Sequence, residues 1–268
     1  AALVCAVCLG IYCLPGSKPD GVSVLAFFLT AGFCFWGTTI LNIWFSFAGV
    51  LLYCLVMKKK PGAMANAFLF STGLAPLITE MLFRYPGEAW HGFTGLGIVL
   101  ALAVGIFIGF IFPAVLPHSP QMHKGYDLYN AAVPIGLIAF FLRSLLYKIF
   151  TSAPPASENV GLADSFLPLS IGFCLVVFLL AIIWGLALGG GKEYGRLLRD
   201  SGYNVDYGTK YGSGAAILNF GVYGLFIVLY YLLIGAKWNA ATLGCVFCMV
   251  CCCYKGSHPA NVWPIMVG

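Results

Sequence analysis

The stretch Gly37-Thr38-Thr39-Ile40-Leu41-Asn42-Ile43-Trp44 returns near the other end as Gly256-Ser257-His258-Pro259-Ala260-Asn261-Val262-Trp263. Both copies follow the pattern G-[ST]-x-x-x-N-[IV]-W, and they are 256 − 37 = 219 residues apart. At this offset residues 1–49 align without a gap on residues 220–268, with ten identities. Glycine and polar positions are among the matches, and apolar composition alone does not force those. The sequence therefore predicts an internal repeat, which constrains a fold more than local patterns do.

The composition places the chain in a lipid bilayer. Hydrophobic residues make up 61% of the 268 residues, charged residues only 9%, and the mean hydropathy is +0.94. About a quarter of the residues of a soluble domain are charged. Membrane-spanning chains satisfy their backbone groups as helices or closed barrels, and long apolar runs favour helices. We therefore expect an all-α polytopic bundle whose partner is the lipid bilayer, and dispersed basic residues argue against a nucleic-acid partner.

Apolar segments and polar loops alternate along the chain. The segments cover residues 1–14, 22–36, 42–57, 64–83, 92–116, 130–150, 166–188, 213–234 and 240–253. This gives about eight to nine membrane segments, seven of them in one repeat. An odd number turns the second copy upside down in the membrane, the inverted-repeat arrangement of many secondary transporters. We expect residues 1–219 to be a first repeat truncated at its N-terminus, and residues 220–268 to begin a second repeat truncated at its C-terminus.

Two short segments leave an alternative open, because residues 22–36 and 241–253 fall short of the about twenty that a spanning helix needs. They either cross or re-enter on the same side. If all segments cross, nine basic residues of the first repeat lie in loops on one side and only Arg84 lies on the other. By the positive-inside rule the basic loops are cytoplasmic. The sequence thus predicts a multi-pass protein of the inner (plasma) membrane.

The repeated motif is the main candidate site. Its glycine and asparagine interrupt apolar sequence, and paired helix breaks in two halves point to a transport site. We expect the side chains of Asn42 and Asn261 to satisfy the backbone groups freed by each break, and Thr38 and Ser257 to cap the helices that follow. The two breaks are expected to approach each other around a polar pocket. The candidate solute-binding residues are Gly37, Thr38, Asn42, Gly256, Ser257 and Asn261. The alternative is a tight turn at the membrane surface, anchored by Trp44 and Trp263.

Glu80 is the other candidate for solute or ion binding, because it is the one acidic residue well inside an apolar segment. An ionisable group within a membrane segment is by default a candidate for a functional site. Arg84 stands one helical turn further on, so a structural ion pair near the interface competes with a functional role.

Weaker candidates lie in the polar linker and beyond it. His118, His123 and Asp127 are the nearest set of metal-ligand types, and Arg143 either pairs with Asp127 or reaches the lipid headgroups. Five cysteines between Cys245 and Cys253 resemble a metal site in spacing, but cysteine in an apolar segment acts as a small hydrophobe that lets helices approach. We expect no metal site. Nucleotide-binding and hydrolase motifs do not occur in the sequence, so we expect no cofactor.

Several stretches resemble the uncharacterised bacterial multi-pass membrane family known as domain of unknown function 1576. They are residues 39–44, 71–80, 112–118, 123–130, 214–219 and 258–262, of which His123-Lys124-Gly125-Tyr126 is the most specific. The likeness covers most of the chain. It implies a membrane location and carries no activity.

A transporter or channel-like permease for an unidentified small solute, with a possible coupling ion, is the function that these patterns favour. A membrane-embedded enzyme with a polar centre of His118, His123 and Asp127 is the rival class. A structural membrane protein without catalytic activity is the third.

Overall fold

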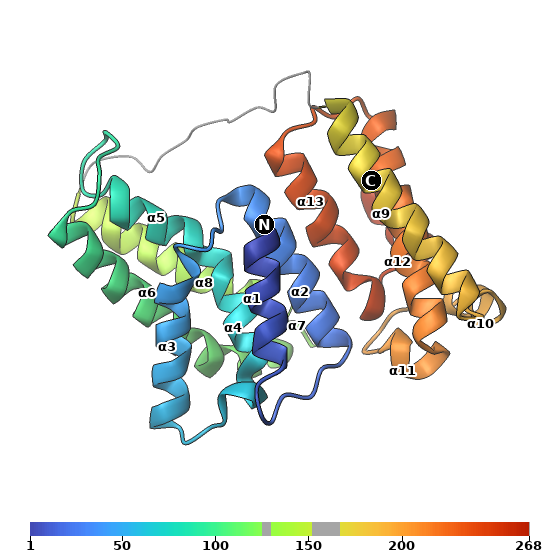
Figure 1. Cartoon of the computed structure of the whole chain (residues 1–268), viewed down its shortest axis with the longest axis horizontal. Coiled ribbons are helices and arrows are strands. Elements are labelled where there is room, and N and C mark those ends of the chain that lie inside the picture. The colour runs from blue at the N-terminus through green and yellow to red at the C-terminus, as the bar shows by residue number, and fades with distance from the viewer. Residues whose placement is uncertain (125–129, 152–166, 268) are drawn as a thin grey trace. The chain divides into compact units, whose positions relative to one another are not determined.

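The computed structural model describes residues 1–124, 130–151 and 167–267, and every regular element in these ranges is helical (Figure 1). The helices form two compact units. One contains Ala1–Lys18 and Trp36–Asn159, and the other contains Pro19–Phe35 and Val160–Gly268. The predicted all-α class is therefore confirmed. Each unit holds one copy of the G-[ST]-x-x-x-N-[IV]-W loop.

The first unit is built on a close crossing of α3 and α6. Its helices are α1 (Ala2–Tyr12), α3 (Ile43–Val56), α4 (Ala65–Ser71), α5 (Ala75–Phe83), α6 (Gly95–Val115), α7 (Ser119–His123) and α8 (Ala132–Ser144), with 3-10 turns η2 (Pro61–Met64), η3 (Thr72–Leu74) and η4 (Leu116–His118) and a π-helical turn η5 (Leu145–Ile149). A side chain at Gly105 would overlap Phe45, and one at Gly109 would overlap the Ser46 carbonyl. Small residues thus let two apolar helices touch along their backbones, as expected where lipid supplies no hydrophobic driving force.

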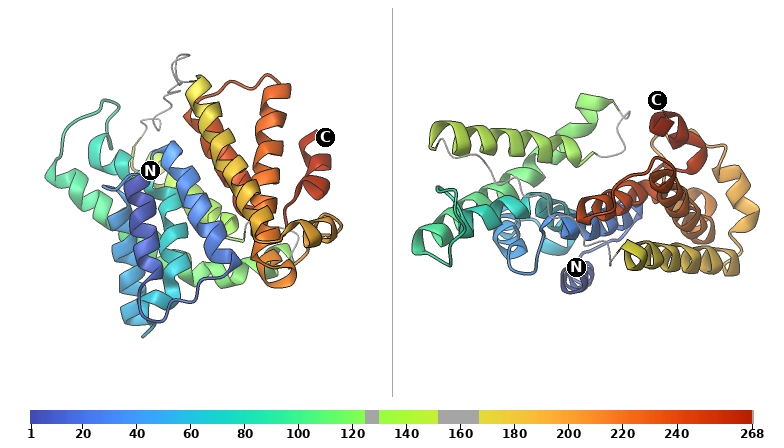
Figure 2. Two further views of the ribbon diagram at one scale, coloured as in Figure 1. Left: turned by 45° about the vertical axis from the view of Figure 1, so that its right-hand side comes forward. Right: turned by 90° about the horizontal axis from the view of Figure 1, so that it is seen from above.

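The second unit pairs α9 with α12 and packs α2 and α13 against them. Its helices are α2 (Gly21–Phe33), α9 (Leu167–Ala187), α10 (Gly191–Leu197), α11 (Tyr207–Tyr211), α12 (Ser213–Leu233), α13 (Ala240–Val250) and α14 (Pro259–Val267), with the 3-10 turn η7 (Cys251–Tyr254). Figure 2 shows α9 and α12 side by side. Phe178, Ile227, Val246 and Val250 are fully buried in this core. The 3-10 turn η1 (Cys34–Trp36) extends α2 towards the first motif loop.

The helices α2 and α13 lie at equivalent positions of the predicted repeat, and they begin in the same way. Asp20 and Asn239 stand 219 residues apart at the two N-caps. Their backbones are nearly identical, with φ/ψ of −142°/−169° and −144°/−177°. Each side chain accepts a hydrogen bond from the backbone N–H three residues on, Ser23 N at 3.0 Å and Thr242 N at 2.9 Å. These are standard N-caps, which stabilise a helix by about 1 kcal/mol.

The same two helices pack antiparallel against each other (Figure 1). Leu29 and Cys248, which occupy equivalent positions of the repeat, meet where the Cys248 thiol lies 4.0 Å from the Leu29 carbonyl oxygen. The start of α2 lies beside the end of the α13–η7 segment, since the Gly21 N–H donates to Asp206 Oδ2 at 3.1 Å and Lys255 Nζ pairs with the same oxygen at 3.8 Å. Equivalent helices therefore contact each other through an equivalent residue.

Gly32 makes this contact sensitive to side-chain size. A Cβ atom there would lie 2.6 Å from the Cys248 sulfur and 2.9 Å from the Gly244 carbonyl oxygen. We expect Gly32→Leu to lower the free energy of unfolding by about 1–3 kcal/mol, the usual cost of overpacking. Gly172→Ala on α9 is the matched control, because nothing lies within 4 Å of its position. Chemical unfolding in detergent, followed by circular dichroism, measures both variants, and an unchanged midpoint for Gly32→Leu contradicts the close contact.

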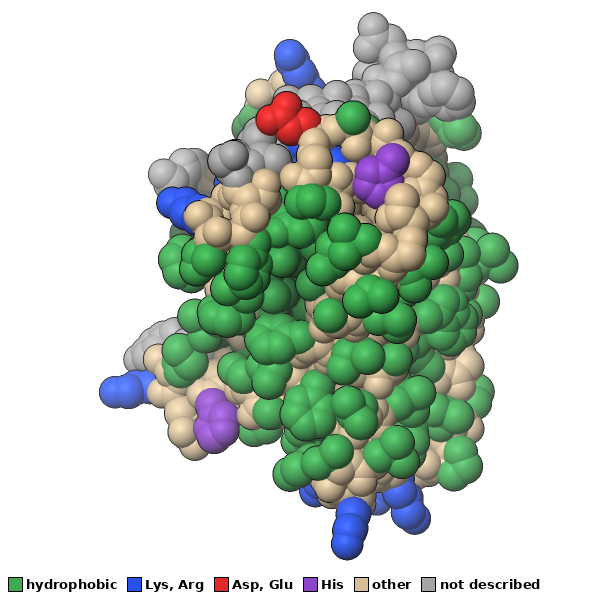
Figure 3. All heavy atoms as spheres, turned by 90° about the vertical axis from the view of Figure 1, so that its left-hand side faces the viewer, with side chains coloured by type: hydrophobic (Ala, Val, Ile, Leu, Met, Phe, Trp, Pro, Cys, Tyr) green, Lys and Arg blue, Asp and Glu red, His purple; other side chains and the backbone are tan. Residues whose placement is uncertain are grey.

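Five helical stretches of the described chain are long and apolar enough to cross a membrane. They are Pro61–Phe83, Gly95–Met122, Ala132–Ile149, Pro168–Ala187 and Ser213–Leu233. Four other apolar helices are shorter, namely Ala2–Tyr12, Gly21–Trp36, Ile43–Val56 and Ala240–Tyr254. Five candidate spans are thus found in the described chain, and the expected count of eight to nine membrane segments stays a prediction. Figure 3 shows a face covered by hydrophobic side chains, with lysine and arginine at its margins, as a lipid-facing surface requires.

Candidate functional site

The first motif loop is closed by Asn42. Gly37 adopts a φ of 102°, which favours glycine, and so turns the chain after η1. The fully buried Asn42 amide donates from Nδ2 to the Gly37 carbonyl at 2.8 Å, and its Oδ1 accepts from the Thr39 N–H at 2.8 Å. One side chain therefore bridges both ends of the helix break.

The second motif loop is closed by the same two bonds. Gly256 has a φ of 126°, the Asn261 Nδ2 donates to the Gly256 carbonyl at 2.7 Å, and Asn261 Oδ1 accepts from the His258 N–H at 2.9 Å. The predicted role of the two asparagines, to satisfy backbone groups freed by the break, is thus what these bonds do. Each side-chain amide is hydrogen-bonded to the backbone of its own loop, so it holds that loop in its conformation.

Each loop is held by different neighbours. In the first unit the second N–H of Asn42 donates to Thr79 Oγ1 at 2.8 Å, and the Thr38 hydroxyl donates to the Thr72 carbonyl at 3.1 Å. In the second unit the buried Tyr207 hydroxyl donates to the Gly256 carbonyl at 2.7 Å. The Asn219 amide there donates to the Ser257 carbonyl at 2.8 Å.

The prediction that Thr38 and Ser257 cap the following helices is wrong. Helix α3 starts at Ile43, five residues beyond Thr38, so the Thr38 hydroxyl stands outside the capping position and bonds to the turn at Thr72 instead. Helix α14 starts at Pro259, which makes His258 the residue before the helix and leaves Ser257 one position too early. An N-cap residue stands directly before the first residue of its helix, and the loop places at least one further residue between Thr38 or Ser257 and the helix.

A polar cluster before α11 holds the second loop. Asp200 accepts hydrogen bonds from Lys210 Nζ at 2.7 Å, the Tyr211 hydroxyl at 2.6 Å and the Gly202 N–H at 2.9 Å. Its backbone carbonyl contacts the His258 Nε2 at 2.9 Å, and the Ser201 carbonyl lies 3.4 Å from the Asn261 Nδ2. The sequence did not indicate this cluster. Its one signal is the spacing that puts Asp200 ten and eleven residues before Lys210 and Tyr211.

Acid is expected to weaken this cluster in a defined window. Burial raises the pKa of Asp200, but the hydrogen bonds from Lys210, Tyr211 and Gly202 outweigh it and lower the pKa to about 2. A carboxyl group whose pKa is lower in the folded state stabilises the fold fully above its unfolded pKa. That contribution is lost as the pH falls from about 4 to about 2.

Unfolding midpoints between pH 6 and pH 2 measure this contribution. Asp200→Asn should flatten the decline below pH 4 relative to the wild type. Glu193→Gln is the control, because the Glu193–Arg196 pair is exposed and such pairs contribute little. Equal acid sensitivity of Asp200→Asn and the wild type contradicts the assignment.

Glu80 lies in a second polar cluster, within the first unit. The carboxylate on α5 accepts a hydrogen bond from the Tyr147 hydroxyl and lies 3.8 Å from Arg84 Nη1. Arg84 is buried and also donates to the Glu88 carbonyl at 3.0 Å. Tyr147 stands on the π-helical turn η5, a deviation that often marks functional sites. The expected i,i+4 pair is present, and Tyr147 is a further partner that the sequence did not indicate.

The secondary candidates are not gathered into a site by the described residues. His118 is exposed at the end of η4, and Arg143 is exposed on α8. Asp127 and the side chain of His123 lie outside the described part of the chain. Within that part, no group of three histidine, cysteine or acidic residues is placed to hold a metal ion. No disulfide joins the cysteines, all of which lie in the described ranges, and Cys248 lets α13 approach α2, as expected of a small hydrophobe.

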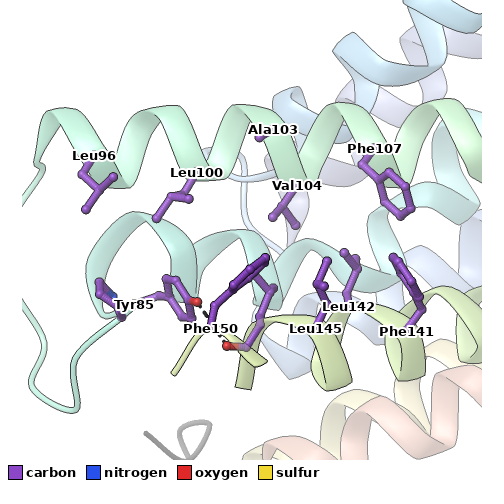
Figure 4. Close-up of a pocket in the computed structure, with 12 residues that line it drawn as sticks. Tyr85, Leu96, Leu100, Ala103, Val104, Phe107, Phe141, Leu142, Leu145 and Phe150 are labelled. Atoms are coloured by element: carbon purple, nitrogen blue, oxygen red, sulfur yellow. Dashed lines mark hydrogen bonds between the residues drawn. The ribbon is translucent and has the colours of Figure 1, made fainter. Parts of the chain in front are cut away.

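An apolar pocket of about 490 Å³ opens between α6 and the α8–η5 segment of the first unit (Figure 4). Leu100 and Val104 line it on one side, and Leu142 and Leu145 line it on the other. Its one polar lining side chain is Tyr85, whose hydroxyl already donates to the Leu146 carbonyl at 3.1 Å. The pocket suits hydrocarbon, and none of the predicted site residues lines it.

Comparison with known proteins gives a family and no activity. No curated protein and no solved structure matches the chain. A family model described as "Protein of unknown function (DUF1576)" matches residues 1–148 and 191–268, which include both motif loops, Glu80 and Asp200. The expected resemblance is confirmed, and this helical chain belongs to the DUF1576 family.

Proposed function

We propose that this chain is a multi-pass transporter or channel-like permease of the inner membrane, and that it moves a small solute past two equivalent broken-helix loops. The antiparallel contact of α2 and α13 through Leu29 and Cys248 is the observation that carries the proposal.

That contact supports an inverted repeat. Two equivalent helices that run antiparallel and touch at the same residue are related by a two-fold axis through the contact, perpendicular to both. For helices that cross a membrane such an axis lies in the membrane plane. Repeats related in this way are typical of secondary transporters, whose sites lie at the repeat interface. A repeat about the membrane normal would bring the two helices together in parallel.

The lengths of the repeated helices support a break within the membrane. Helix α2 has 13 residues and α3 has 14, which at 1.5 Å per residue gives about 20 Å each, short of the about 30 Å hydrocarbon core. The motif loop joins them. Irregular backbone at membrane depth occurs only inside protein or beside a wet cavity. The two loops are therefore our candidates for the solute path, with Asn42 and Asn261 holding their shape.

Glu80 is our candidate for ion or solute binding beside the first loop. Thr79, which precedes Glu80 on α5, accepts a hydrogen bond from the Asn42 side chain, so α5 links the carboxylate to the loop. The Tyr147 hydroxyl and Arg84 hold the carboxylate in place. A change at Glu80 would thus act on the loop without removing the asparagine bridge.

A flux assay tests the proposal. Purified protein in liposomes is exposed to gradients of glycerol, urea, glycine and glucose, and solute entry is followed by light scattering. We expect at least one of these solutes to enter faster than into protein-free liposomes, and Glu80→Gln to slow that entry at least tenfold. Lys192→Gln, an exposed change, should leave it intact. Entry no faster than into protein-free liposomes for all four solutes overturns the proposal.

A further inference from the structure

The ring of His258 has a defined tautomer. Its Nε2 lies 2.9 Å from the backbone carbonyl oxygen of Asp200. A carbonyl oxygen only accepts, so Nε2 carries the hydrogen. In a neutral imidazole the other nitrogen, Nδ1, then presents a lone pair.

That lone pair is buried. His258 is 1% exposed, and its Nδ1 has no hydrogen-bond partner among the residues that the structure describes. Buried polar atoms are nearly always paired, and each exception calls for an explanation. A basic nitrogen that is held in place and bonded to nothing can take up a proton without first breaking a hydrogen bond.

Two ionisable side chains near the ring come from α11 and from the segment before it. Asp200, before α11, is a carboxylate whose charge favours a protonated ring, and it accepts hydrogen bonds from Lys210 and Tyr211. Tyr207, on α11, has its ring centre 6.1 Å from that of His258. Burial acts against these attractions and lowers the pKa of His258 below its ordinary 6.5. The ring is therefore neutral at pH 7.

A proton at this ring acts directly on the second loop. The backbone N–H of His258 donates to Asn261 Oδ1 and so closes the loop, while the ring Nε2 bonds to the Asp200 carbonyl and holds the loop to that segment. The equivalent residue in the first loop is Thr39, which cannot titrate. The chain thus places one proton acceptor at one of two otherwise similar loops.

We propose that His258 Nδ1 binds the coupling proton of the transporter, and that protonation loosens the second loop from the Asp200–Gly202 segment. The coupling role in this proposal rests on the proposed function, that is, on the chain being a transporter. The reason for the loosening is that a charged ring with a second N–H is poorly accommodated where Nδ1 has no acceptor. Binding and release of one proton would then alternate the loop between two positions.

Nitrogen NMR of histidine-labelled protein in nanodiscs tests the proton site without any solute. The chain has four histidines, and His258→Gln identifies the signal of interest. Its glutamine can still donate to the Asp200 carbonyl, and circular dichroism checks its fold. We expect His258 to show the Nε2–H tautomer at pH 7 and to titrate below 6.5. An Nδ1–H tautomer, a charged ring at pH 7, or no titration down to pH 4 overturns the proposal.

Proton-driven flux tests the coupling. In liposomes with trapped pyranine, the solute that enters in the four-solute assay should carry protons with it, and His258→Gln should abolish this proton entry while solute exchange without a pH gradient persists. His91→Gln, at an exposed position, is the control. Solute entry unaffected by a pH gradient overturns the coupling and leaves the transporter standing. If none of the solutes enters, the transporter proposal fails, and the NMR titration still decides whether His258 binds the proton.

Discussion

Gly256→Ala is expected to lower the free energy of unfolding far more than Gly37→Ala, although the two glycines occupy equivalent positions. Both have a φ that side chains rarely adopt, 126° and 102°, which costs about 1 kcal/mol for alanine. At Gly256 a Cβ would also overlap the backbone carbonyl oxygen of Gly202, whereas at Gly37 the nearest atoms are Pro76 carbons at 3.7 Å. Backbone cannot move aside as a side chain can. We expect about 2–4 kcal/mol for Gly256→Ala, since strain and overpacking add.

Chemical unfolding of the two variants in one detergent provides the comparison. The Gly202→Ala variant is informative as well, because its Cβ would overlap the Gly256 carbonyl from the other side. It should therefore destabilise like Gly256→Ala. Equal, small effects at Gly37 and Gly256 would show that the segment around Gly202 does not clamp the second loop.

Asn42→Ala is the second large effect that we expect. The side chain is fully buried and makes three hydrogen bonds, to the Gly37 carbonyl, the Thr39 N–H and Thr79 Oγ1. Removal leaves these groups buried without their partner, and one such group costs about 1–3 kcal/mol. Allowing for partial relaxation, we expect a loss of about 3–5 kcal/mol in the free energy of unfolding.

Asn42→Asp separates the donors from the acceptor. Aspartate can still accept from the Thr39 N–H, but it offers the Gly37 carbonyl no donor and faces it with charge. It should therefore destabilise as much as alanine does. Thr79→Val, which removes one bond and keeps the shape, should cost about 1 kcal/mol. An Asn42→Ala protein as stable as the wild type would contradict the bridging role.

The all-α class could be predicted from composition, and the two similarly bonded loops could be predicted from rare residues. Glycine at positions with positive φ and an asparagine five residues later can be recognised without a structure. The cap positions Asp20 and Asn239 follow the same offset, yet they escape a search for identities because aspartate and asparagine differ in letter and agree in chemistry.

The partners of these residues could not be predicted. Thr79, Tyr147, Asp200 and Tyr207 meet the loops or Glu80 from elements far along the chain. Such contacts depend on tertiary packing, which leaves no local periodicity. The number of crossing segments does not follow from the sequence for a related reason. A helix of 11 to 14 residues is apolar enough for a membrane but too short to span it alone.

The inverted repeat is tested most directly by the sidedness of two equivalent lysines. Lys18 and Lys237 are both exposed, and they stand 219 residues apart in the loops before α2 and α13. In a Cys13→Ala background, which removes the one exposed cysteine among the described residues, Lys18→Cys and Lys237→Cys are labelled in intact cells with a membrane-impermeant maleimide. We predict that Lys237→Cys is labelled from outside and that Lys18→Cys is labelled only after the cells are opened. Labelling of both from the same side would contradict the inverted repeat.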